Sequence, residues 1–480
     1  MKNSYASTEL LTPVLDGGIH TTNFFNGRLL SAEDMQREQH AGRLQRRQLG
    51  QAIGDGVVYG LGVRDTGDVS TAVGKAGRTV SVSAGMAINR LGQALYLPAD
   101  MDVSLVREKE VVDGDAGLFS PCSKMPDTDL LSGTGVYILV ITPASGYEGQ
   151  APAGGVSSGD LSARGGCRRR DAVEGVQFRL VRVKLESLPN TSAELLSDIV
   201  RCATAVESGT DKAKNLSLLR NLLAHICFGT GEFDRFVRDP FRKVENEAPQ
   251  SSYGVVDALR SGKIPALTDC DVPLGLVYWT SSGIQFVDQW SVRRRTVSKP
   301  ASASWPVVFS ERRRAEAEAR FEQFQEQLNQ LLAENSSPFE LSLLTATGWF
   351  RYLPAAGMIP VSSASVIRYM QENNAAAFNA TSSITGLDPV QFLERITCRK
   401  AAFLEGARIG HLFSDSLTYP PVDLNSPTFL FLYLVRENVE GLKEPVPPRP
   451  YLIFTSGSLP YYGNARFDLA RYDFSSYAFV

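Results

Sequence analysis

The stretch NFFNGRLLSAEDMQREQ (Asn23–Gln39) decides how the N-terminal part of the chain folds. Ser31, followed three residues later by Asp34, fits a capping box, in which each side chain bonds the other residue's backbone N–H. Leu30 and Met35 are spaced to pack across this cap as a hydrophobic staple. The stretch therefore predicts a helix that begins immediately after Ser31.

The body of this helix has too few apolar residues to form a broad buried face. They are Ala41, Leu44, Leu49, Ala52 and Ile53. Gly42 and Gly50 each weaken a helix by about 1 kcal/mol relative to Ala. We therefore expect the helix to gain order by packing on something else, and we expect Gly54 and Gly56 to end it.

Alternating and continuous apolar runs predict the other elements. The expected strands are Val57–Val63, Arg78–Ser83, Met86–Asn89, Ala94–Pro98, Val136–Thr142, Val176–Leu185, Leu274–Thr280, Ile284–Val287, Thr428–Arg436 and Tyr451–Thr455. The expected later helices are Ser192–Val206, Lys214–Phe228 and Glu311–Glu334. Asn89–Gly92 is typical of a hairpin connection, and Pro354–Pro360 of a tight turn region. The mixture predicts an α+β fold that is β-rich with several helices.

The length of 480 residues predicts more than one domain. We expect a helix plus β docking module over 1–110 and a mixed α+β domain over 111–309, with a Gly/Ser-rich exposed loop at 145–166. A long helix or connector follows over 310–339. Its apolar seam covers less than two heptads, so we favour packing against this chain over a coiled coil with a partner. Residues 340–480 are expected to form a β-sandwich-like domain.

Charge and cysteine usage limit the class of protein. The net charge of −3 argues against nucleic acid or an anionic membrane as the main partner. The six cysteines have no paired spacing, which favours buried reduced thiols over a zinc site or a disulfide framework. No apolar run reaches the length of a signal peptide core or a membrane span. We therefore expect cytoplasmic assembly without a signal peptide, with the final location open between the cytoplasm, a membrane-docked position and the outside of the cell after lysis.

The motifs that resemble reactive sites lack the context that their chemistry needs. Gly54, Gly56 and Gly60 have one residue too many for a dinucleotide fingerprint, and they follow a helix and enter a strand. Ser157 matches a nucleophile elbow but lies in the Gly/Ser-rich loop. His225 is expected to be a packed core residue. The sequence therefore predicts no catalytic residue, no cofactor and no metal site.

Arginine clusters are the sharpest electrostatic feature of the sequence. They are Arg43/Arg46/Arg47, Arg168–Arg170, Arg293–Arg295 and Arg312–Arg314. Each has acidic residues nearby, so a solvated face and subunit contacts are both open, with nucleic acid as a weaker alternative.

Six blocks together resemble structural proteins of phage-tail-like contractile injection systems and related phages. They are NFFNGRLLSAEDMQREQ (23–39), RRQLGQAIGDGVVYGLGV (46–63), VSVSAGMAINRLGQALYLP (80–98), TDCDVPLGLVYW with IQFVDQWSVRRR (268–295), and RYLPAAGMIPV (351–361) with LIFTSGSLPYYGNARFDLARYDFS (452–475). The resemblance implies a baseplate or peripheral subunit, such as a cage, an extension or a fibre attachment. Its expected partners are other particle subunits, including baseplate, spike or sheath-proximal proteins, and further copies of itself in a symmetric assembly. It supplies no catalytic residues.

The interface candidates come from the N-terminal module and from one arginine cluster. They are Phe24, Phe25, Arg28, Leu29, Arg43, Arg46, Arg47, Arg293, Arg294 and Arg295. Two rival functions stay open. The aromatic C-terminus could make the chain a receptor- or glycan-binding tail protein, and Ser157 could belong to a hydrolase of cell-surface polymers.

Overall fold

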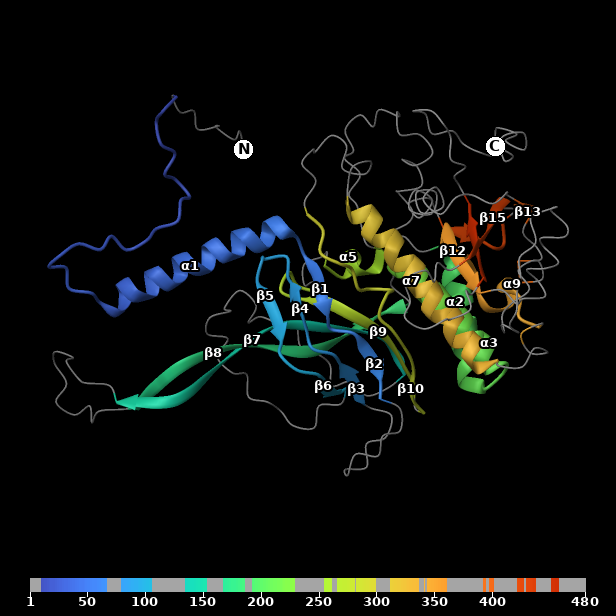
Figure 1. Ribbon diagram of the computed structural model, residues 1–480. Coiled ribbons are helices and arrows are strands. Elements are labelled where there is room, and N and C mark those ends of the chain that lie inside the picture. Colours follow the sequence, from blue (N-terminus) through green and yellow to red (C-terminus); the bar gives the residue numbers. More distant parts are fainter. Residues whose placement is uncertain are drawn as a thin grey trace, which may run out of the picture.

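The computed structural model shows a mixed helix and strand protein, as the α+β prediction requires (Figure 1). It describes residues 10–66, 79–105, 134–152, 167–185, 192–228, 254–260, 266–280, 282–298, 311–335, 341, 343–360, 392–393, 397–400, 421–426, 429–436 and 450–456. No helix in these ranges combines the length and the apolar character that crossing a membrane requires.

The N-terminal part consists of one long helix and two small antiparallel sheets. The helix is α1 (Ala32–Ile53), which begins at the predicted residue. One sheet has the order β1-β4-β5 and comprises Gly56–Gly60, Gly85–Ile88 and Ala94–Leu97. The other has the order β2-β3-β6 and comprises Val63–Asp65, Thr79–Val82 and Met101–Ser104. The predicted hairpin at Asn89–Gly92 joins β4 and β5, with Gly92 N donating to Asn89 O at 2.9 Å.

The single strand predicted over Val57–Val63 is wrong, because the chain divides there between two sheets. Leu61 adopts a left-handed backbone with φ of 55° and Gly60 one with φ of 62°. The apolar pattern does not reveal the division, since Val57 of one sheet and Val63 of the other belong to the same buried core.

A four-stranded antiparallel sheet with the order β10-β9-β7-β8 forms the centre of the molecule. Its strands are β7 (Gly135–Pro152), β8 (Cys167–Val183), β9 (Val272–Thr280) and β10 (Gly283–Asp288). Side chains alternate between its faces. Val136, Ile138 and Val140 of β7 belong to one core, and Tyr137 and Leu139 to another.

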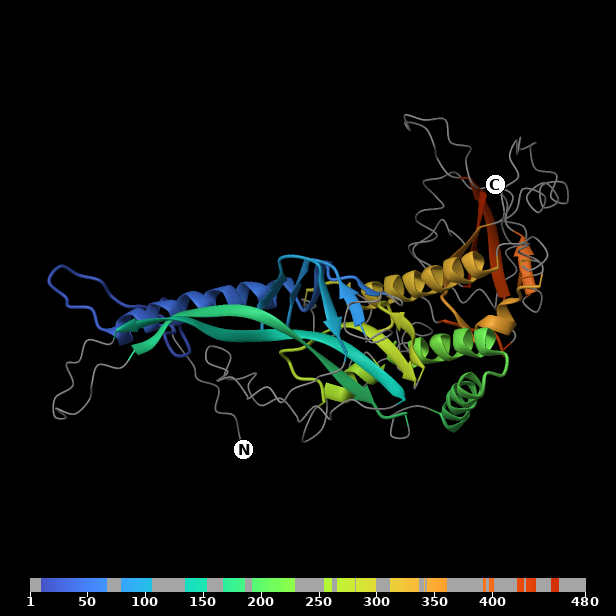
Figure 2. The same ribbon diagram turned by 90° about the horizontal axis from the view of Figure 1, so that it is seen from below.

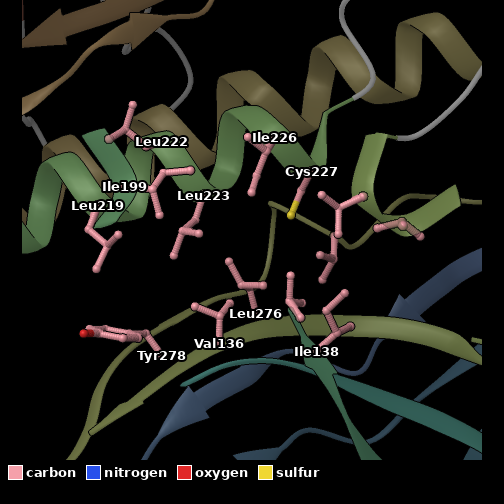
Figure 3. Packing of buried hydrophobic residues seen from close by; sticks show 14 of the residues in the cluster. Val136, Ile138, Ile199, Leu219, Leu222, Leu223, Ile226, Cys227, Leu276 and Tyr278 are labelled. Atoms are coloured by element: carbon pink, nitrogen blue, oxygen red, sulfur yellow. The ribbon is translucent and has the colours of Figure 1, made fainter. Parts of the chain in front are cut away.

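The first of these cores lies beneath helices α2 (Ala193–Ser208), α3 (Lys212–Cys227) and α5 (Gly254–Arg260). Figure 3 shows Leu219, Leu223 and Ile226 of α3 above Val136 and Leu276 of the sheet. The second core joins the opposite face of the sheet to the small N-terminal sheets. Burial on both faces explains the continuous apolar runs of β7 and β9.

The loop predicted over residues 145–166 is partly wrong, because β7 continues to Pro152 and β8 begins at Cys167. The two strands pair antiparallel as far as Pro152 and Cys167. Residues 145–150 and 170–175 are almost all exposed. With no core on either side, these strands have no need of apolar alternation, and the sequence therefore resembles a loop.

Helix α7 (Glu311–Glu334) has the predicted bounds and packs within this chain, as favoured above. Its Phe324, Leu328 and Leu331 share a core with the C-terminal elements. These are helix α9 (Ala346–Trp349), a two-stranded sheet of β11 (Tyr352–Leu353) and β14 (Val422–Asp423), and a sheet of order β12-β16-β15-β13. The last four strands are Ala356–Pro360, Pro450–Thr455, Phe429–Arg436 and Thr397–Lys400. The turn region predicted over Pro354–Pro360 is therefore mostly strand β12, whose Gly357 permits close contact with Phe454.

A buried ion pair fastens α3 to the sheet and to α7. Arg220 Nε lies 2.6 Å from Asp288 Oδ2, with both side chains almost fully buried. The same guanidinium reaches Glu326 at 2.9 Å and Gln330 at 2.7 Å. Burial alone would raise the pKa of Asp288, but Arg220 holds it below its usual range. This network connects the central and C-terminal parts.

The cysteine prediction holds only in part. Cys202 and Cys227 are free and buried, and burial raises the pKa of Cys227 to about 12. Cys270 is disulfide-bonded, to a sulfur outside the described side chains, so the expectation of reduced thiols throughout is wrong. Cysteines far apart in sequence can meet in the fold, which spacing alone does not reveal.

Candidate docking arm

The N-terminal helix α1 is held at its start by the predicted capping box. Ser31 Oγ accepts from Asp34 N at 3.1 Å, and Ser31 N donates to Asp34 Oδ2 at 3.0 Å. The bonds that the Asp34 carboxylate accepts from Ser31 N and from Ser31 Oγ, together with the Arg28 guanidinium, lower the pKa of this carboxyl. Leu30 and Met35, the predicted staple, are both close to half exposed, so any staple between them buries little.

Most of α1 lies in solvent. Of its 22 residues only Ala41 and Gly50 are buried. Leu49 is 66% exposed and Ile53 is 54% exposed. The described part of this chain therefore covers Ala41 but leaves Leu49 and Ile53 of the thin apolar stripe largely exposed.

The segment before α1 is attached to it by polar contacts. Thr22 N donates to Glu38 Oε2 at 3.1 Å, and Thr22 Oγ1 donates to the backbone O of Asp34 at 2.9 Å. Arg28 forms an ion pair with Asp34 at 2.6 Å and lies over the ring of Phe25. The apolar side chains of the segment remain 56–103% exposed: Leu10, Leu11, Val14, Leu15, Phe24, Phe25 and Leu29.

The outer ends of β7 and β8 extend in the same direction as α1 (Figures 1 and 2). Arg43 Nε of α1 lies 3.5 Å from Glu174 Oε1 of β8, which joins the helix to this ribbon. We call residues 10–53 together with the ribbon residues 145–152 and 167–175 the docking arm. It projects from the central sheet on the side away from the C-terminal elements.

Backbone contacts anchor the arm at the C-terminal end of α1. A Cβ atom on Gly50 would lie 2.2 Å from the backbone O of Gly92. After the helix, Gly54 approaches Val297 so closely that a Cβ would lie 1.7 Å from its backbone O. Val57 N donates to Arg294 O at 2.8 Å. The glycines that resembled a dinucleotide fingerprint are thus turn and close-approach positions.

Arginines of the 293–295 cluster contribute to this anchor. Arg293 donates to the backbone O atoms of Leu61 at 2.8 Å and Gly60 at 2.5 Å. Arg294 is 7% exposed and donates to backbone O atoms of its own turn. Arg295 is exposed and pairs with Glu318 at 2.7 Å. Contacts with a partner protein stay a prediction for Arg293, Arg294 and Arg295. The bonds described here already give Arg293 and Arg294 a role within this chain.

Residues that the sequence analysis did not single out complete the anchor. Asn89 Nδ2 donates to Gln93 Oε1 at 2.7 Å, and Arg90 N donates to Asp269 O at 3.1 Å. Arg90 also pairs with Asp257 at 2.9 Å. Three of the sequence blocks quoted above therefore meet here. The polar residues of the Asn89–Gly92 turn are the sequence feature that could have indicated these contacts. We call the contacts among residues 50–61, 89–93, 257–271 and 293–297 the anchor junction.

The arm residues on the interface prediction differ in how they are placed. Phe24, Phe25 and Leu29 are exposed, and Arg46 is exposed with its Nε donating to Gly42 O at 3.1 Å. Arg47 is half-buried. The structure thus brings the aromatic and arginine candidates onto one projecting element.

Most positions behind the rival functions lie where the structure gives no description. Ser157, His411 and the aromatic C-terminus beyond residue 456 lie outside the described residues. His225 stacks on Tyr352 with ring centroids 3.5 Å apart, and burial lowers its pKa to about 3. Within the described ranges, no group of three or more His, Cys, Asp and Glu could hold a metal ion.

The comparisons with known proteins add no family to this description. Neither the family models nor the curated proteins that were searched contain a match to this chain.

Proposed function

We propose that this chain is a non-enzymatic structural subunit of a phage-tail-like contractile injection particle, at the baseplate or its periphery. The proposal rests on the resemblance of its sequence blocks and on one observation, the projecting arm. In this proposal the arm attaches the subunit to its neighbours, and the central and C-terminal parts form the body of the particle component.

The arm supports an attachment role because its elements have little burial of their own. An isolated helix and an isolated two-stranded ribbon are both marginally stable in water. Here α1 buries two of 22 residues, and ribbon residues 146–150 and 170–175 are exposed. Exposed Phe24, Phe25 and Leu29 add apolar surface at the outer end. Contact with a neighbour would bury this surface and stabilise the arm.

The finer organisation belongs to the same proposal. We propose a multidomain chain with the module boundaries given above and a β-sandwich-like C-terminal domain. We also propose cytoplasmic assembly, several copies related by symmetry, and neighbours among the baseplate, spike or sheath-proximal subunits. Arg295 and the arginines of α1 would help to fix the register of these contacts.

Deletion of the arm in the native producer tests the proposal. Residues 1–48 can be removed while Gly50, Gly54 and Val57, which contact the anchor junction, are retained. We expect the full chain to sediment with purified injection particles and the deletion variant to be lost from them. Normal incorporation of the deletion variant contradicts the docking role, and absence of the full chain from the particles contradicts the proposed function itself.

A matched control separates docking from folding. Leu185→Ala lies in the central core region, far from the arm, and a folded variant should incorporate normally. The deletion variant must retain the thermal unfolding transition of its central core, because α1 contributes only Ala41 and Gly50 to the buried residues.

A further inference from the structure

One exposed face of α1 carries a pattern that is complementary to itself. Gly42 lies at its centre, with Glu38 and Arg46 four residues away on either side and Met35 and Leu49 seven residues away. Spacings of four and seven residues return to the same side of an α-helix. If a second α1 runs in the opposite direction across Gly42, Glu38 of one helix therefore lies opposite Arg46 of the other. Met35 then lies opposite Leu49.

This face is open in the described structure. Met35 is 44% exposed, Leu49 is 66% exposed, and Glu38 and Arg46 are exposed. A Cβ built on Gly42 would meet only the far end of the Arg46 side chain within 4 Å, at 3.7 Å, among the described residues.

Apart from the bond from Thr22 to Glu38, the contacts of α1 named here lie on other sides of the helix. Two of these contacts are the ion pair of Arg43 with Glu174 and the close approach of Gly50 to Gly92. Arg43 comes one position after Gly42 of the open face, and Gly50 comes one position after Leu49. One position turns the helix by about 100°. Thr22 bonds one oxygen of Glu38, and the second carboxylate oxygen has no bond in the described part of the chain.

We propose that the occupant of this face is α1 of a second copy of the same chain, packed antiparallel across a two-fold axis at Gly42. This rests on the proposed function, because it names the partner of the docking arm. Glu38 of each copy pairs with Arg46 of the other, and Met35 packs on Leu49. The two glycines let the helix backbones approach at the crossing point.

Charge distribution along the whole helix supports the antiparallel direction. The first half contains Glu33, Asp34 and Glu38 with Arg37, and the second half contains Arg43, Arg46 and Arg47 without an acid. A parallel pair would place like ends together, and like charges in contact destabilise. A two-fold contact also closes on itself, so that each residue pair occurs twice.

Charge reversal in the full chain tests the pairing. Sedimentation velocity at concentrations of about 10–100 µM should show a dimer for the wild type. Glu38→Arg alone and Arg46→Glu alone should each lower the association constant by about tenfold or more, because two pairs become repulsive. An equimolar mixture of these two variants should restore dimers, since only the heterodimer then has opposite charges at both contacts.

Cysteine crosslinking tests the axis. Gly42→Cys should form a disulfide-linked dimer on mild oxidation, because the two copies of this residue face each other at the axis. His40→Cys, an exposed position on the far side of the helix, should not.

Several results would overturn the proposal. They are a monomeric wild type at every concentration, a mixture that stays monomeric, and crosslinking in particles to a different subunit through Gly42→Cys. The first two results contradict the helix pairing only. The particle role still stands in that case when deletion of residues 1–48 removes the chain from particles, so failure of the pairing is distinguishable from failure of the proposed function.

Discussion

Substitution of Gly50 by Ala should destabilise the arm, although Ala is the better helix former. On an exposed helix the change stabilises by about 1 kcal/mol. At Gly50 the new Cβ would lie 2.2 Å from the backbone O of Gly92 and 2.9 Å from its Cα. Both are backbone atoms, so the helix itself must move off the β4–β5 turn. Overpacking typically costs about 1–3 kcal/mol, and a clash with backbone atoms belongs to the upper part of that range, about 2–3 kcal/mol, which leaves a net loss of about 1–2 kcal/mol.

Gly42→Ala is the matched control, because the same change in the same helix meets only the flexible end of Arg46 at 3.7 Å. It should stabilise α1 by about 0.5–1 kcal/mol. The two variants therefore differ in sign as well as in size.

Hydrogen exchange of the α1 amides measures this local effect, whereas global unfolding of a large chain is rarely two-state. The experiment is run at low protein concentration, where the proposed helix pair is dissociated. Gly50→Ala should speed exchange by roughly 5- to 30-fold, and Gly42→Ala should slow it. Slower exchange in both variants would refute the close contact between Gly50 and Gly92.

Three further predictions concern buried groups. Arg220→Ala leaves Asp288 buried without its cation and should cost about 3–5 kcal/mol in guanidinium unfolding of the region around α3. The His225 pKa of about 3 means that the fold favours the neutral ring. The contribution of this residue to the free energy of unfolding should therefore be fully present above pH 6.5. It should fall by up to about 1.4 kcal/mol per pH unit from there towards pH 3. His225→Phe should keep the stack on Tyr352 and lose that slope in unfolding experiments across this range. The Cys227 thiol, with a pKa of about 12, should resist alkylation at pH 8 until the protein unfolds, as mass spectrometry of labelled peptides can show.

The sequence predicted best those features whose cause is local. The capping box at Ser31 and Asp34 needs only neighbouring atoms, and the start of α1 was predicted correctly. The bounds of α7 were also correct, because strong helix formers fill Glu311–Glu334. The thin apolar stripe of α1 predicted a helix that gains order by packing on something else, and the described part of the chain buries only Ala41 and Gly50 of it.

Features that depend on distant contacts could not be predicted in the same way. Gly50 was counted as a weak point of the helix, yet its missing side chain is what permits contact with Gly92, 42 positions further along the chain. Arg293 was grouped with exposed arginines, although it donates to the backbone of Gly60 and Leu61. Neither partner can be recognised before the fold is known, because no short-range pattern links them.

Under the proposed docking role, the anchor junction has to carry the load that a neighbour places on the arm. Helix α1 has 22 residues and therefore extends about 33 Å at 1.5 Å per residue. A force on its outer end acts through this length on the few contacts at Gly50, Gly54 and Val57. Apolar packing alone is not directional and would let the helix slide. Its direction is fixed by the backbone hydrogen bond from Val57 to Arg294 and by the two bonds that the Arg293 guanidinium donates to the backbone O atoms of Gly60 and Leu61. Gly50, Gly54 and Arg293 thus fix the arm where it meets the body, and Phe24, Phe25 and Leu29 stay exposed at its outer end.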